Sequence, residues 1–291
     1  MRNLKDITYV DLRLDFAFKR VFGTPGHEKQ LLKLVNAILP EEGFTSVRLS
    51  TNERVGLRRD SRRAVFDIFA TTSDGSDVTI EMQYGEQADF NQRMVFYSSF
   101  PIQNHVKRGK SGEIEPHLYY AFPHVYVIGI TDFILPGVPN NPDIVNKYTI
   151  RNENRPDRCL TDKVTYVTVE LPKLTKSLEE LETPADFMFY ALRNIWHMKQ
   201  MPEEYKNQDF DNLFELCKFA AMKESEQRRY VAELMAELDE GSRMATAINK
   251  GLALGREEGY KESAKNMKQM GLPLETICQA TGLSKEAVEA L

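Results

Sequence analysis

Apolar residues in the first part of the chain follow two different spacings. Between residues 11 and 39 they recur every three or four positions, which predicts helices. Polar and apolar residues then alternate in three short stretches, 45–57, 62–72 and 76–85, and this alternation predicts β-strands. The first third of the chain is therefore expected to form a helical segment followed by three strands.

The remaining pattern completes a mixed α/β arrangement. Helical spacing returns at 87–108, and a β-branched and aromatic run at 121–135 predicts a buried strand. Residues 135–162 are rich in Pro, Asn and Asp and predict loops, whereas 163–174 predicts one more strand. From about Ser177 onward the pattern is helical, and the chain ends in two short predicted helices.

These changes of pattern divide the chain into three expected parts. We expect an α/β core at 1–136, an extension with a further strand and helices at 137–222, and a charged helical region at 223–291. The last part ends in the short helix pair, whose second helix has no basic residue apart from Lys285, which argues against reading of the major groove. Packing or self-association is the role we expect for these C-terminal helices.

The composition fits a globular cytoplasmic protein. The 291 residues are 42% hydrophobic, enough to bury a core, and the longest apolar runs are too interrupted to span a bilayer. The first residues lack the apolar stretch of a signal peptide. Three separated cysteines and five histidines show no disulfide or metal-ligand spacing. A net charge of −5 gives no general basic surface, so contacts to nucleic acid are expected only from local clusters.

The turn between the second and third predicted strands decides which of their side chains meet. A two-residue turn at Asp74 and Gly75 sets apolar residues against polar ones, whereas a three-residue loop from Ser73 to Gly75 closes an apolar face. The three-residue loop pairs Phe66 with Met82, Ile68 with Ile80 and Ala70 with Val78. In that register Asp67 lies directly opposite Glu81.

Two carboxylates side by side on a sheet favour a shared proton or a bound cation. Gln83 lies on the same face as Glu81, because side chains alternate along a strand. Oxygen ligands of this kind suit Mg²⁺ or Mn²⁺, and such an ion polarises a phosphoryl group. Equally, Asp67 and Glu81 fit a solvent-facing strand pair whose carboxylates only keep the sheet soluble.

Several motifs together are similar to those of one nuclease family. They are DLRLDFAFKRVFG with its D-x-x-F-K-x-x-F-G spacing, FDIFATTSDGSDVTIEMQ, QRMVFYSSF, HVYVIGITDFIL and NMKQMGLPLETICQATGLSKEAVEAL. With this order of elements, the chain resembles the recombination-promoting nuclease and transposase branch of the PD-(D/E)xK nuclease superfamily. The resemblance implies a restriction-endonuclease-like α/β core, in which helices flank a mixed sheet, followed by a helical C-terminal half. It also implies metal-dependent cleavage of DNA.

By this resemblance, Asp67 and Glu81 bind the metal ion, and Gln83 takes the position of the superfamily's lysine. A glutamine orients a water molecule but cannot act as a general base at neutral pH. Asp15, in the opening helix, matches an acidic residue of the family that completes the metal shell or holds a ligated water. The alternative for Asp15 is an ordinary helical ion pair with Lys19.

Arginines are the candidate contacts to DNA, because the guanidinium fork matches the phosphate oxygens. Four of them, Arg58, Arg59, Arg62 and Arg63, follow the first predicted strand and extend into the start of the second, and a solvated loop explains them equally well. Arg93, in the helix after the third strand, is placed to reach a phosphate or an active-site carboxylate. Its alternative is an arginine that caps the edge of the core.

The sequence thus predicts an endonuclease that needs Mg²⁺ or Mn²⁺, acts on DNA and is linked to recombination or mobile elements. The C-terminal helices are expected to support a homo-oligomer. The alternative, from another class, is a catalytically silent member of the same fold that binds DNA or a protein partner.

Overall fold

The structure, a computed structural model, describes residues 7–50, 67–87, 89–106, 122–137, 141–206 and 208–291. The chain separates into two compact units, Met1–Tyr230 and Val231–Leu291. The first unit contains the sheet and the predicted metal-binding residues, and the second is helical. The three sequence parts divided at 136 and 222 stay predictions.

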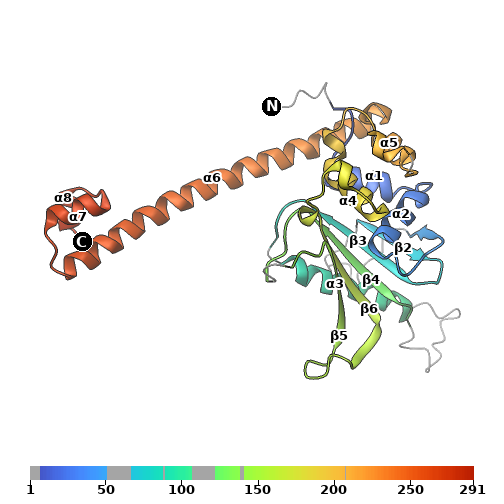
Figure 1. Cartoon of the computed structure of the whole chain (residues 1–291), viewed down its shortest axis with the longest axis horizontal. Helices are drawn as coiled ribbons and strands as arrows, with labels where there is room; N and C mark the ends of the chain where they lie inside the picture. Colours follow the sequence, from blue (N-terminus) through green and yellow to red (C-terminus); the bar gives the residue numbers. More distant parts are fainter. Residues whose placement is uncertain (1–6, 51–66, 88, 107–121, 138–140, 207) are drawn as a thin grey trace. The chain divides into compact units, whose positions relative to one another are not determined.

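A mixed sheet forms the centre of the first unit (Figure 1). In the described residues it has six strands in the order β1-β2-β3-β4-β6-β5. The strands are β1 (Val47–Leu49), β2 (Ile68–Thr72), β3 (Asp77–Gln83), β4 (Val125–Thr131), β5 (Val145–Arg151) and β6 (Cys159–Glu170). β3, β4 and β6 are parallel, whereas β1, β2 and β5 pair antiparallel with their neighbours. The predicted order of helix, three strands, helix and strand is confirmed, as is the mixed α/β class.

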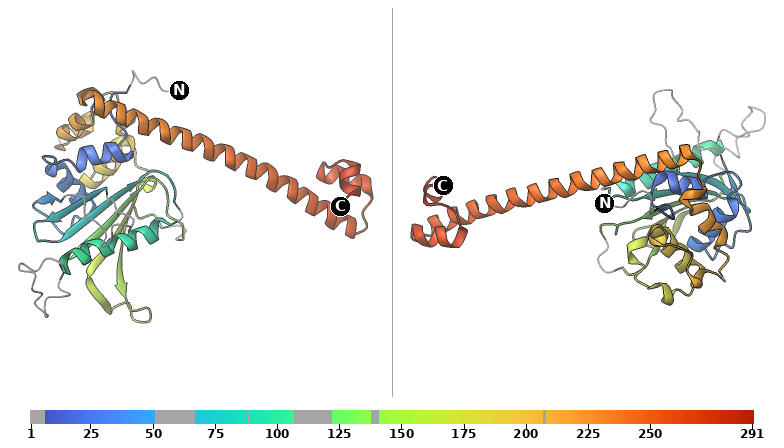
Figure 2. Two further views of the ribbon diagram at one scale, coloured as in Figure 1. Left: turned by 180° about the vertical axis from the view of Figure 1, so that it is seen from behind. Right: turned by 90° about the horizontal axis from the view of Figure 1, so that it is seen from above.

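Helices flank this sheet (Figures 1 and 2). Those of the first unit are α1 (Asp15–Phe22), α2 (Glu28–Ile38), α3 (Phe90–Val106), α4 (Pro184–Asn194) and α5 (Asp211–Cys217). α3 packs on β4 and β6, while α2 packs on β1 and α4. Ile68, Ile80 and Ile128 are almost completely buried at paired positions of β2, β3 and β4, so the centre of the sheet belongs to the core.

The hairpin of β2 and β3 has the predicted register. Ile68 pairs with Ile80, and Ala70 pairs with Val78. The Thr72 backbone N–H donates to the Ser76 carbonyl at 2.9 Å, which leaves three residues in the loop. The last of them, Gly75, has φ +87°, a left-handed conformation that a residue with a side chain rarely adopts. The predicted partner Phe66 lies outside the described residues.

Gly129 of β4 lets α3 lie directly on the sheet. A Cβ atom at this position would come within 2.6 Å of Phe90 Cζ and 2.9 Å of Met94 Sδ, and both side chains are buried. Gly129 is also the direct neighbour of Glu81 on β3. The absence of a side chain at Gly129 therefore sets how closely α3 approaches the face that carries Glu81.

The prediction of loops at 135–162 was wrong for 145–151 and for 159–162. β5 occupies Val145–Arg151, and β6 already begins at Cys159. Most side chains of β5 are exposed, so the strand has no alternating apolar face that its sequence could reveal. Its conformation depends on backbone pairing with β6, in which Tyr148 lies opposite Tyr166.

The second unit contains most of α6 (Glu224–Gln269), together with α7 (Leu274–Thr281) and α8 (Lys285–Glu289). Ala264, Ile277 and Val288 form its small core. The predicted terminal helix pair is confirmed, and Gly282 ends α7 in a left-handed conformation with φ +71°. No helix within the described ranges has both the length and the apolar character needed to cross a membrane.

Candidate active site

Asp67 and Glu81 lie next to each other on the sheet face that α3 covers. Asp67 directly precedes β2, and its Oδ2 accepts a hydrogen bond from the Met82 backbone N–H at 2.7 Å. Extending the pairing of Ile68 with Ile80 by one position sets Asp67 opposite Glu81. The exposed fractions are only 6% for Asp67 and 9% for Glu81, so both carboxylates are held away from bulk water.

Burial makes these carboxyl groups weak acids. Burial, followed by repulsion from Glu81, raises the pKa of Asp67 to about 8. Burial likewise raises the pKa of Glu81 to about 7, although the charges of Arg93 and Lys19 act in the opposite direction. The two groups share one electrostatic environment, so their protons belong to the pair. At neutral pH the pair therefore tends to retain a proton unless a cation is added.

Lys19 of α1 places an ammonium group between two acidic residues. Its Nζ lies 3.0 Å from Asp67 Oδ1 and 2.5 Å from Asp15 Oδ1. Burial acts to lower the pKa of Lys19, but the charge of Asp67 and the hydrogen bond and charge of Asp15 outweigh it and raise that pKa. Lys19 is therefore protonated at neutral pH. The helical ion pair between Asp15 and Lys19 is present, and Lys19 extends it to the buried carboxylate.

Arg93 of α3 holds the other end of the site. Its guanidinium forms an ion pair with Glu81 Oε1 and donates to Gln83 Oε1 at 3.1 Å and to the Tyr97 hydroxyl at 3.2 Å. The Gln83 amide in turn donates to the Gly85 carbonyl at 3.1 Å. Both ends of the Gln83 amide are thus fixed, so its orientation is set by the protein.

A buried arginine, Arg13, fixes the ends of the two strands beside Gln83. Arg13 donates to both carboxylate oxygens of Asp11, at 2.9 and 2.7 Å, and to Asp132 Oδ2 at 2.5 Å. The Asp132 backbone N–H donates to the Gln83 carbonyl at 3.1 Å. The Arg13 guanidinium also lies 4.7 Å from the centre of the Tyr84 ring. This network ties the N-terminal segment to the ends of β3 and β4.

The residues present fit a hard divalent cation. Glu81 Oε2 is buried and has no hydrogen-bond partner, so one carboxylate oxygen is uncommitted. In the described part of the chain, no group of three or more His, Cys, Asp or Glu side chains is arranged to hold a metal. Mg²⁺ commonly binds through one or two carboxylates and completes its shell with water and substrate phosphate. Asp67 and Glu81 meet that requirement.

Most of the predicted site residues converge. Lys19 joins Asp15 to Asp67, and Arg93 joins Glu81 to Gln83, so two sets of contacts meet where Asp67 lies beside Glu81. Whether Arg93 also contacts a phosphate stays a prediction. The four arginines predicted to contact DNA, Arg58, Arg59, Arg62 and Arg63, lie outside the described residues.

Sequence reasoning missed the central position of Lys19. The signal available was its place in the D-x-x-F-K-x-x-F-G motif, four residues after Asp15, and this spacing was interpreted only as a local helical pair. The contact to Asp67 joins α1 to the start of β2, and no local pattern reports a contact over that separation.

Comparison with known protein families assigns the class of this chain. The profile of the PD-(D/E)XK nuclease family transposase matches residues 12–247, and the chain belongs to this family. The match includes α1, the complete sheet and the first half of α6. Neither curated proteins nor solved structures gave a match. Family membership supports a role related to nucleases or transposases.

Proposed function

We propose that the protein is a cytoplasmic endonuclease that hydrolyses DNA phosphodiester bonds with Mg²⁺ or Mn²⁺ and takes part in recombination or in the movement of mobile elements. The observation that carries this proposal is the buried pair of Asp67 and Glu81 with the uncommitted Glu81 Oε2. Membership of a nuclease family makes DNA the substrate that best suits this pair.

The roles of the residues follow from their contacts. Asp67 and Glu81 would hold the ion, which when bound neutralises their charge and polarises the phosphoryl group. Gln83 orients the attacking water through its fixed amide, and it does not accept the proton. Arg93 keeps the Glu81 carboxylate in place and supplies positive charge beside it. Asp15 assists by holding Lys19, whose ammonium balances the charge of Asp67.

The alternative is a catalytically silent protein of the same fold that binds DNA or a protein partner. Two observations favour it. Gln83 stands where a basic residue is expected by resemblance, and the Lys19 ammonium already compensates Asp67. In that alternative the acidic residues serve only to stabilise the junction of α1, β2 and β3.

Plasmid cleavage separates the two functions. We expect the purified protein to nick supercoiled DNA with Mg²⁺ or Mn²⁺ and to leave it intact in EDTA. Binding of DNA without nicking, with each metal and on both single- and double-stranded substrates, would support the silent alternative. Cleavage that persists in EDTA would contradict the role of a metal at Asp67 and Glu81.

We also propose that the protein forms a homodimer through α6. From Val231 to Gly259, apolar or small residues alternate at spacings of three and four, as in a coiled coil. They are Val231, Leu234, Leu238, Gly241, Ala245, Ile248, Leu252, Gly255 and Gly259. Leu238, Ile248 and Leu252 are each more than half exposed. A second copy is the occupant that fits, because an identical helix presents the same repeat for knobs-into-holes packing.

A pair of matched substitutions tests this assembly. Leu252→Glu places a charge within the repeat and is expected to convert the dimer to monomer in light scattering. Leu254→Glu introduces the same charge at an equally exposed leucine that faces away, because residues two apart on a helix do not share a face. A wild-type protein that is monomeric at high concentration, or equal effects of both variants, would contradict assembly through this repeat.

A further inference from the structure

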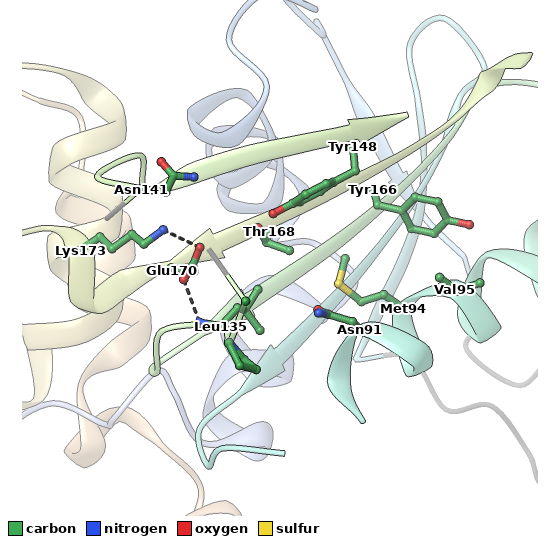
Figure 3. Close-up of a pocket in the computed structure, with 12 residues that line it drawn as sticks. Asn91, Met94, Val95, Leu135, Asn141, Tyr148, Tyr166, Thr168, Glu170 and Lys173 are labelled. Carbon is green, nitrogen blue, oxygen red and sulfur yellow. Dashed lines mark hydrogen bonds and ion pairs between the residues drawn. The ribbon is translucent and has the colours of Figure 1, made fainter. Parts of the chain in front are cut away.

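A pocket of about 340 Å³ lies beside α3, between this helix, β5 and β6 (Figure 3). Asn91, Met94 and Val95 line it from α3, whereas Arg93 of the same helix forms the ion pair with Glu81 and donates to the Tyr97 hydroxyl. Residues 91, 94 and 95 share one side of a helix, and residues 93 and 97 share another. The pocket and the candidate active site therefore lie on opposite sides of α3.

The sheet places the pocket on the same face as the active site. In the strand register, Glu81 is adjacent to Gly129, and Gly129 is adjacent to Thr168, which lines the pocket. Directly paired residues point to the same face of a sheet. Two strand spacings separate Glu81 from Thr168, which corresponds to roughly 10 Å. α3 packs on Gly129 between the two, so a DNA strand cut at Glu81 would pass around this one helix to bring a neighbouring nucleotide to the pocket.

The polar groups of the pocket specify an uncharged occupant. Glu170 is already compensated, because it accepts from Lys173 Nζ and from the Leu135 backbone N–H, each at 2.8 Å (Figure 3). Thr168 Oγ1 differs, because it is buried without a hydrogen-bond partner and Thr168 is only 3% exposed. An occupant that forms a hydrogen bond to this hydroxyl would satisfy the one buried side-chain polar atom that is unpaired among the described residues lining the pocket.

The apolar walls indicate a flat occupant. Tyr148 and Tyr166 come from adjacent positions of β5 and β6, and Met94 faces them from α3 (Figure 3). Tyr148 is 46% exposed and Val95 59%, so the pocket opens to solvent along this side. A planar ring bound against tyrosine, with a polar edge toward Thr168, combines the stacking and hydrogen bonding by which proteins bind an unstacked base.

We propose that this pocket binds a single nucleobase, unstacked from the DNA strand and lying close to the phosphate that is cleaved. The inference rests on the proposed nuclease function. Tyr148 provides the stacking surface and Thr168 Oγ1 the hydrogen bond. The protein would then engage DNA at a nucleotide that leaves the stack easily, as in single strands, mismatches or lesions.

A cleavage ladder on DNA with one abasic site tests the pocket. The labelled substrate lacks a single base, and the wild-type enzyme is assayed with Mg²⁺ or Mn²⁺ at every surrounding phosphodiester bond. The bond at one fixed offset from the abasic site is expected to be cut roughly 5- to 150-fold more slowly than in intact DNA, the range of one base–aromatic stack. Tyr148→Ala should abolish this slowing of cleavage at the fixed offset, and Tyr148→Phe should retain it. Thr168→Val should make the slowing smaller.

The possible outcomes distinguish a failure of the base-binding proposal from a failure of the proposed nuclease function. If the wild-type enzyme cut no bond near the abasic site more slowly than in intact DNA, the base-binding role would be overturned while the nuclease function stayed intact. The same would follow from an unchanged slowing in Tyr148→Ala. The absence of any metal-dependent cleavage would overturn the proposed function itself.

Discussion

Asp67→Asn is expected to lower metal-dependent DNA cleavage by roughly 10²- to 10³-fold or more while leaving the protein folded. Asparagine has nearly the same shape as aspartate, and its side-chain oxygen can still accept the hydrogen bond from the Met82 backbone N–H. It cannot supply the negative charge that a divalent cation requires. The rate of plasmid nicking with saturating Mg²⁺ measures the effect.

Thermal unfolding of the same variant provides the second half of this prediction. Burial raises the pKa of Asp67, which means that the folded state disfavours the ionised carboxylate. The substitution removes this disfavoured buried charge together with its ion pair to Lys19, so we expect a melting temperature close to that of the wild type in the absence of metal. Asp162→Asn, at an exposed carboxylate of β6, is the matched control and should change neither quantity. Near-normal nicking by folded Asp67→Asn would move the reaction to another site.

Divalent metal is expected to stabilise the protein in a manner that depends on pH. At a concentration 100 times its dissociation constant, a ligand contributes about 2.7 kcal/mol, which raises the melting temperature by about 5–10 °C for a domain of this size. The stabilisation should increase between pH 6 and pH 9, because the metal binds the deprotonated pair. Differential scanning fluorimetry with Mg²⁺, Mn²⁺ or EDTA measures it.

The metal-free protein should show the opposite pH trend. The pKa values of Asp67 and Glu81 rise from 3.8 and 4.5 to about 8 and about 7 on folding. Between those limits the folded state binds more protons than the unfolded state, so this pair makes stability fall as pH increases. The contribution should be absent in the Asp67→Asn, Glu81→Gln double variant. A metal-induced shift that persists in this double variant would show that the metal binds elsewhere.

The sequence predicted the acidic pair because its register depends on a local property. Apolar residues of β2 and β3 fit together in only one of the two plausible hairpin registers, and that register alone places Asp67 opposite Glu81. The same argument placed Gln83 on the face of β3 that carries Glu81. In the structure Arg93 contacts both of these residues. The alternation of side chains along β2 and β3, together with the length of the turn between them, was enough to predict this part of the site.

Other features escaped because they depend on contacts distant in the chain. Lys19 reaches Asp67 only after α1 has packed beside β2, and Arg13 reaches Asp132 across most of the first half of the chain. The exposed strand β5 carries no hydrophobic alternation, because pairing with β6 rather than burial defines it. Tertiary contacts determine these features, and periodicity in one segment does not report them.

The position of Lys19 affects the order of folding and metal binding. An ammonium tethered to α1 gives Asp67 and Asp15 a counter-charge that is always present. We therefore expect the chain to fold without metal, unlike small metalloproteins whose folding needs the ion. Binding of the proposed cation would then be a separate step that adds positive charge beside Asp67, and cleavage would begin only after it.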